Sequence, residues 1–273
     1  SGLLMSVIGS NVLAGASGGG AEAYVVAFAH DGSPYISAYD WDSGFGDKYS
    51  NPSSLPPNNC QDVAFSPDGN YLVMAHADSP FVHAYPWSSD GFGSKYSNPS
   101  SLISTFSGEV ARSIAFSPDG SSVAVTHDNS PYATVYAWSS SGWGSKYSDP
   151  SSALPNRGES VAFHPDGNAI AVGHHSSPYI SAYSWSSSGF GSKYSNPSTL
   201  PANSGLSTAF SPDGNHIATV HSSPPYVTAY PWSSGFGSKY SNPSTLPGGT
   251  GRGVAFSPDG NDIAVAGSGG SNI

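Results

Sequence analysis

Apolar and polar residues alternate along this chain in short runs that recur in the same order. In the run Phe81–Trp87 the large side chains stand at every second position, with smaller residues between them. A period of two is typical of a β-strand with two different faces. No segment shows the spacing of an amphipathic helix. The pattern therefore predicts an all-β protein.

One copy of the repeated unit divides into four short segments separated by turn residues. The turn Ser66–Gly69 contains Pro and Asp-Gly, which are placed as a tight turn between two strands requires. Two further turns are expected at Asp78–Pro80 and Gly91–Gly93. The expected strands of this copy are Asp62–Phe65, Tyr71–His76, Phe81–Trp87 and Ser94–Ser97.

The unit occurs five times in the sequence, at intervals of 46 to 51 residues. The tryptophan that ends the third segment marks each copy: Trp41, Trp87, Trp138, Trp185 and Trp232. A period in this range indicates a propeller or a solenoid. Four strands in each period favour the blade of a β-propeller.

The two ends of the chain contain complementary parts of the unit, which favours a closed ring. We expect five four-stranded blades within residues 23–267, closed by N- and C-terminal strands, with an arm at 1–22 and a tail at 268–273. The second segment occurs six times, so one of Tyr24–His30 and Asp262–Gly267 is surplus. We favour Tyr24–His30 as the strand in the ring, because Gly267 replaces the histidine. Six blades, one of them incomplete, are the alternative.

Two motifs resemble the WD40-type propeller repeat. They are V-A-F-S-P-D-G-N at Val63–Asn70 and Y-V-T-A-Y-P-W at Tyr226–Trp232, and the likeness covers about residues 24–267. The chain departs from the family in lacking its Gly-His dipeptide and in keeping Trp-Asp only at Trp41-Asp42. The resemblance implies a propeller that serves as a binding scaffold, and it specifies no ligand.

Composition narrows the classes of function. The formal net charge is −10, and the five lysines fall at one repeat position, so the sequence predicts no basic patch for nucleic acid. Cys60 is the sole cysteine, which excludes an intrachain disulfide and a cysteine-based zinc site. No apolar run is long enough to span a bilayer, so we expect no membrane insertion.

A histidine stands four residues before the proline of each Ser-Pro-Tyr turn and its variants. In a ring these histidines would share one face with the aromatic residue after the proline, forming repeated shallow sites for a sugar or another neutral ligand. The candidate residues are His30, Tyr35, His76, Phe81, His127, Tyr132, His174, Tyr179, His221 and Tyr226. The alternative is that each histidine hydrogen-bonds its own turn.

The sequence predicts no catalytic residue, metal site or cofactor. One histidine per blade is too sparse for zinc, whose ligand bonds are about 2.0–2.1 Å long. The aspartates of the Ser-Pro-Asp-Gly turns are expected to accept local backbone hydrogen bonds. The copies are also too alike for one of them to have diverged into an active site, so a propeller enzyme such as a lactonase is the less favoured expectation.

The segment Ser6–Gly20 lies outside the repeat and resembles the opening stretch of structural proteins of marine tailed phages. The resemblance implies a phage virion decoration or adhesion protein on the virion surface, with other virion proteins or host-surface glycans as partners. The candidate docking residues are Val7, Ile8, Val12 and Leu13. The alternatives are a frayed N-terminal tail and an extracellular lectin, secreted or surface-bound, with repeated carbohydrate sites.

Overall fold

The protein is described by a computed structural model that covers residues 24–41, 43–103 and 109–268. These residues form twenty strands and no helix, which confirms the all-β prediction. The strands pair into six sheets of two to four strands, and every strand pairing is antiparallel. The predicted arm at 1–22 lies outside the described residues.

Three sheets have four strands each and correspond to the three central copies of the repeat. The second sheet comprises β4 (Cys60–Phe65), β5 (Tyr71–His76), β6 (Val82–Ser88) and β7 (Gly91–Phe92). The third comprises β8 (Ala111–Phe116), β9 (Ser122–His127), β10 (Ala133–Ser139) and β11 (Gly142–Lys146). The fourth comprises β12 (Gly158–Phe163), β13 (Ala169–His174), β14 (Ile180–Ser186) and β15 (Gly189–Lys193).

The remaining three sheets have fewer strands. The first comprises β1 (Tyr24–Ala29), β2 (Ile36–Trp41) and β3 (Phe45–Lys48). The fifth comprises β16 (Ser207–Phe210), β17 (His216–Val220) and β18 (Val227–Pro231). The sixth comprises β19 (Thr250–Phe256) and β20 (Ile263–Ser268).

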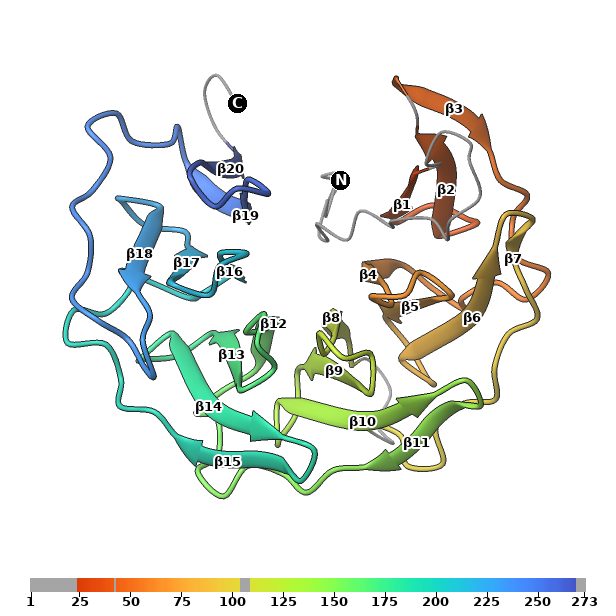
Figure 1. Cartoon of the computed structure of the whole chain (residues 1–273), viewed down its shortest axis with the longest axis horizontal. Coiled ribbons are helices and arrows are strands. Elements are labelled where there is room, and N and C mark those ends of the chain that lie inside the picture. Colours follow the sequence, from red (N-terminus) through yellow and green to blue (C-terminus); the bar gives the residue numbers. More distant parts are fainter. Residues whose placement is uncertain (1–23, 42, 104–108, 269–273) are drawn as a thin grey trace.

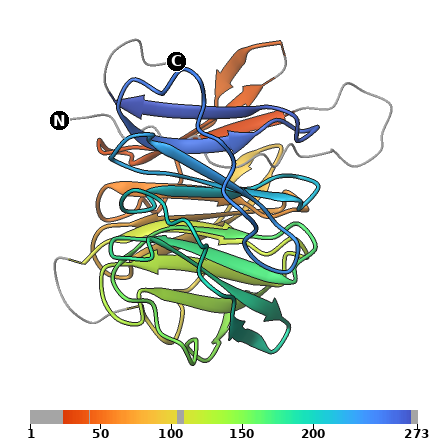
Figure 2. The ribbon, with the colours of Figure 1, turned by 90° about the vertical axis from the view of Figure 1, so that its left-hand side faces the viewer.

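The six sheets follow one another in an arc around a common centre (Figure 1). Strands β4, β8, β12, β16 and β19 lie nearest that centre, and later strands of each sheet lie further out. Seen from the side, the sheets are arranged one after another along the arc (Figure 2). β19 and β20 lie at one end of the arc and the first sheet lies at the other (Figure 1).

The two ends of the chain do not share a sheet, unlike the expected composite blade. β1 pairs with β2, and β20 pairs with β19, so both copies of the second segment are used. β20 already pairs with the edge of β19 that β1 would need in a merged four-stranded sheet. The two ends of the chain therefore lie in separate sheets.

The first turn of the repeat is confirmed, whereas the last is shifted. The Gly69 amide donates to the Ser66 carbonyl at 2.9 Å, as a tight turn requires. The fourth strand of this copy begins at Gly91, where we expected a turn, and Ser94–Ser97 is not a strand. Gly91 has a φ of 91°, which favours glycine, so the turn ends there and Phe92 pairs directly with Trp87.

Neighbouring sheets are joined by an aromatic cluster around each buried tryptophan. The ring centroid of Trp87 lies 4.9 Å from that of Tyr49, which follows β3 of the preceding sheet. It lies 5.3 Å from the ring centroid of Phe65 in its own sheet. The same pair of contacts surrounds Trp138, Trp185 and Trp232 at 5.1–5.6 Å. Edge-to-face aromatic pairs each add roughly 0.5–1.5 kcal/mol beyond burial. These clusters therefore fix the spacing between sheets.

Candidate functional site

The predicted histidines lie at or just after the end of the strand formed by the second segment of the repeat, and four of the five are buried. His76, His127, His174 and His221 have at most 1% of their surface exposed, and His30 is half-buried. His76 Nε2 lies 2.7 Å from His83 Nδ1. For the other four histidines, Nε2 lies 2.9–3.1 Å from a hydroxyl oxygen on the next strand of the same sheet: Ser37, Thr134, Ser181 and Thr228.

The turns that follow these histidines are closed by their own backbone and by histidine side chains. His76 Nδ1 donates to the Ala77 carbonyl at 2.9 Å, and His221 Nδ1 to the Ser223 carbonyl at 2.7 Å. The amide of His76 also donates to the Phe81 carbonyl at 2.9 Å. The alternative interpretation, in which a histidine holds its own turn, therefore matches the geometry of His76 and His221, whereas Nδ1 of His127 and Nδ1 of His174 are buried with no hydrogen-bond partner among the described residues. The buried rings offer no surface to a ligand.

Burial favours the neutral form of the four buried histidines, because it lowers the pKa of each: His76, His127, His174 and His221. It lowers the pKa of His127 and that of His174 to about 4, and it lowers the pKa of His83 to about 3. For His83, the neighbouring His76 lowers the pKa further. A neutral imidazole can donate from one nitrogen and accept at the other, as the bridge between the second and third strands requires.

The aromatic residues of the predicted site contribute mainly to the turns. Phe81 is 1% exposed, and the four tyrosines are half-buried. All five residues have φ near 68–69° and follow a cis proline: Tyr35, Phe81, Tyr132, Tyr179 and Tyr226. A positive φ is uncommon for a bulky residue and is maintained here by the surrounding hydrogen bonds. These residues therefore shape the turn and give no enclosed pocket.

Two equivalent pockets lie at the opposite ends of the strands, where the Asp-Gly turns are. We call them the turn-face pockets. One, of about 240 Å³, is lined by Pro67, Asp68 and Tyr71 of the second sheet and by Asp119 and Trp138 of the third. The other, of about 320 Å³, repeats this arrangement one sheet further along the chain, with Asp119, Asp166 and Trp185. Ser139 and Ser140 of the first pocket correspond to Ser186 and Ser187 of the second.

Asp119 belongs to both turn-face pockets and is held ionised by its turn. Its Oδ1 accepts the Ser117 hydroxyl at 2.6 Å and the Ser121 amide at 3.0 Å. Burial raises the pKa of this carboxyl, but the hydrogen bonds outweigh burial and the net pKa is lowered. The expected local role of these aspartates is therefore confirmed. The carboxylate also presents negative charge at the edge of each pocket.

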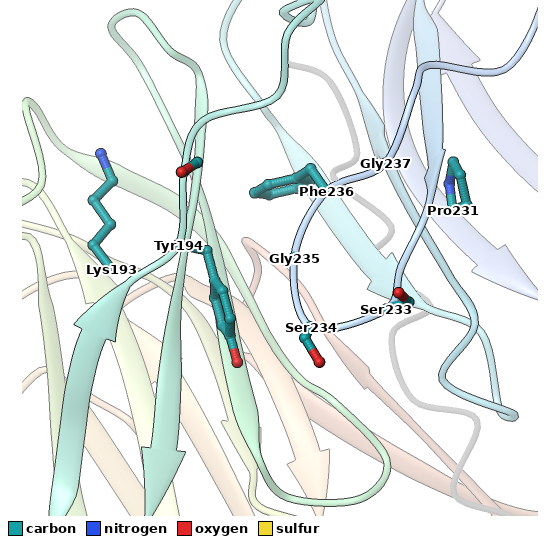
Figure 3. Close-up of a pocket in the computed structure, with 9 residues that line it drawn as sticks. Lys193, Tyr194, Pro231, Ser233, Ser234, Gly235, Phe236 and Gly237 are labelled. Atoms are coloured by element: carbon teal, nitrogen blue, oxygen red, sulfur yellow. The ribbon is translucent and has the colours of Figure 1, made fainter.

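A larger pocket, of about 610 Å³, lies between the end of β15 and the segment after β18. Residues 232–237 read W-S-S-G-F-G, one residue shorter than W-S-S-S-G-F-G at 185–191. With the shorter turn, only an isolated bridge from Trp232 to Phe236 replaces the fourth strand. Figure 3 shows Tyr194 and Ser234 pointing in the same direction, whereas Lys193 extends away from Phe236. The length difference is visible in the sequence, but the pocket that it opens is not.

Sequence reasoning placed the candidate site at the histidine end of the strands and missed the turn-face pockets. The signal for them was the recurrence of Ser-Pro-Asp-Gly and Trp-Ser-Ser at fixed spacing. Within the described residues, no group of three or more histidine, cysteine, aspartate or glutamate side chains is arranged to hold a metal ion. No helix long and apolar enough to cross a membrane occurs in residues 24–41, 43–103 and 109–268.

The pockets lie between sheets and combine an indole edge, a proline, serine hydroxyls and a carboxylate. This combination suits a small polar ligand with an apolar face. Comparison with models of known protein families gave no match, and neither did comparison with curated proteins. The function is therefore argued from the geometry of the chain itself.

Proposed function

We propose that this chain is a non-enzymatic adhesion protein of a phage virion, built as a WD40-like propeller that binds host-surface glycans. The observation that carries the proposal is the repetition of one pocket at two equivalent positions between neighbouring sheets. Repeated, nearly identical sites suit multivalent binding, because weak sites that engage together gain avidity. Catalysis by a single centre would favour one diverged copy.

The radial order of the sheets supports a propeller. Each complete sheet has four antiparallel strands, with the first strand nearest the centre (Figure 1). We interpret each sheet as a blade, so the chain contains six blades with incomplete ends. Such a scaffold leaves the turns between strands available for ligands.

The chemistry of the turn-face pockets supports a saccharide. Sugars present hydroxyl groups around an apolar ring face, and such a face can pack against Pro67, which is exposed at the first pocket. Asp119 accepts hydrogen bonds from hydroxyls, while the exposed Ser139 and Ser140 both donate and accept them. The pockets are small and open, so we expect weak binding at each one.

A glycan array followed by calorimetry tests the proposal. Because Asp119 lines both turn-face pockets, Asp119→Asn should weaken binding at two sites at once. The matched control is Asp259→Asn, since Asp259 accepts the same bonds from Ser257 and Asn261 in the sixth sheet but lines neither pocket. Equal loss in both variants would indicate an effect of the turn on stability and contradict the assignment.

The virion location rests on the segment Ser6–Gly20, which lies outside the described residues. We expect the chain to purify with phage particles and to lose that association when residues 1–20 are deleted. Glycan binding should survive the deletion. A deletion without effect on association would favour the secreted lectin, and turnover of a lactone would contradict both non-enzymatic functions.

A further inference from the structure

The sixth sheet stops after its second strand. In the second to fifth sheets the second strand is hydrogen-bonded on both sides, to a first and to a third strand. β20 pairs with β19 on one side only, and no strand among the described residues pairs with its other edge. An unpaired edge presents backbone amides and carbonyls that can pair with another chain.

The side chains of β20 are apolar and unusually exposed. Its sequence is I-A-V-A-G-S, and four of its six residues are exposed. Ile263 is 43% exposed, whereas its equivalents in the four preceding sheets are fully buried: Leu72, Val123, Ile170 and Ile217. The sheet therefore lacks the neighbour that covers this position elsewhere in the molecule.

Two aromatic residues that correspond to the tryptophan partners of the complete sheets contact no tryptophan among the described residues. In four sheets the indole contacts a phenylalanine of the first strand and a tyrosine from the preceding copy. The corresponding residues here are Phe256 and Tyr240. Tyr240 is 43% exposed, and Phe256 is half-buried with no ring contact among the described aromatic pairs.

Two backbone carbonyls occupy the positions that bind the third strand in the complete sheets. The backbone amide of each buried tryptophan donates to the carbonyl of the residue just before the second strand. This bond is 2.7 Å long from the Trp87 amide to the Asn70 carbonyl and from the Trp232 amide to the Asn215 carbonyl. The buried tyrosine two residues earlier donates its hydroxyl to a carbonyl, at 2.7 Å from Tyr230 to Thr199. By position in the repeat, the matching carbonyls at the sixth sheet are those of Asn261 and Thr245.

We propose that β20, Tyr240 and Phe256 form a strand-acceptor site for an extended segment of a partner polypeptide. The segment that fits carries the pattern apolar-x-Ala/Val-Tyr-x-Trp, which β6, β10 and β14 share. Its backbone pairs with β20, and its tryptophan fills the space between Tyr240 and Phe256. This is strand addition to a sheet edge, in which main-chain bonds give affinity and alternate side chains give specificity. The site is independent of the glycan pockets.

The chain's own matching strand is engaged elsewhere. β2 carries I-S-A-Y-D-W but is paired with β1 and β3, in a different sheet from β20 (Figure 1). Moving β2 onto β20 would break its pairing with β1. A free segment of another polypeptide can bind β20 without breaking an existing strand pairing, which favours a partner over closure within the chain.

Binding of a synthetic peptide with the sequence of residues 177–194 tests the site on the full chain. Fluorescence anisotropy should show binding, and a control peptide with Tyr183→Ser and Trp185→Ser should bind at least about ten-fold more weakly, the loss expected for buried aromatic anchors. In the chain, Tyr240→Ser and Phe256→Ser should weaken binding similarly. Leu200→Ser, which changes another exposed apolar residue, should leave it unchanged.

Hydrogen exchange locates the contact. The peptide should slow exchange of amides in β20 and leave β17 unchanged, because β20 is paired on one edge whereas β17 is paired on both. Absence of binding, equal binding of the two peptides, or protection that spares β20 would overturn the proposal. Protection of β20 equal to that of β17 before peptide is added would also overturn it, since the chain or a second copy would then already fill the site.

Discussion

Mild acid should destabilise the protein strongly, because it folds with buried neutral histidines. Burial lowers the pKa of His127 and His174 to about 4 in the folded chain, against about 6.5 in the unfolded chain. Between these values the unfolded chain binds more protons than the folded chain. Stability is therefore highest above pH 6.5 and falls as the pH drops toward 4.

The magnitude follows from the two pKa values. At pH 5 a histidine with a pKa of 6.5 is about 97% protonated and one with a pKa of 4 is about 10% protonated, which costs ~2 kcal/mol of unfolding free energy. His127 and His174 together therefore cost about 4 kcal/mol between pH 8 and pH 5. The lowered pKa of His83 acts in the same direction. This loss is a large part of the ~5–15 kcal/mol that stabilises a typical domain.

Urea denaturation followed by tryptophan fluorescence measures this loss at pH 5 and pH 8. His127→Gln is the informative variant, because the glutamine amide can reach the Thr134 hydroxyl that Nε2 contacts at 3.0 Å and does not titrate. The variant should lose about 2 kcal/mol of the pH dependence, and adding His174→Gln should remove about 2 kcal/mol more. Equal stability of the unsubstituted chain at both pH values, or full pH dependence in the double variant, would refute the reasoning.

Two further predictions concern buried groups. Tyr136→Phe should lower the unfolding free energy by about 1 kcal/mol, because the Tyr136 hydroxyl donates to the Ser101 carbonyl at 2.7 Å from a fully buried side chain. Urea denaturation at pH 8 measures the cost, and an unchanged midpoint would show that the bond contributes nothing. Burial also raises the pKa of the Cys60 thiol. A thiol reagent should therefore label Cys60 only in denaturant, whereas rapid labelling of the folded chain would show that β4 is open to solvent.

The sequence predicted the strands and turns well, because alternation and Pro-Asp-Gly turns are local signals. It misplaced the fourth strand of the second sheet, since we expected Gly91–Gly93 to form the turn, whereas the positive φ of Gly91 ends the turn and the strand begins there. Repeat spacing also does not show whether a side chain is buried or exposed. The sequence therefore left both a ligand role and a turn role open for His76, and its burial favours the turn.

The ends of the chain and the pockets depended on long-range packing. Complementary halves of the repeat suggested closure, but pairing of β1 with β2 and of β20 with β19 keeps the two ends in separate sheets. The turn-face pockets join residues about 50 positions apart, such as Asp68 and Asp119. No local pattern in the sequence reports such a distance.

Calorimetric titration of the full chain with a glycan selected on an array tests the central claim most directly. Repeated turn-face pockets predict more than one saccharide bound per chain with similar affinities, and a lower affinity in Asp119→Asn, because Asp119 lines both pockets. A single site per chain, or an affinity that Asp119→Asn leaves unchanged, would contradict the account.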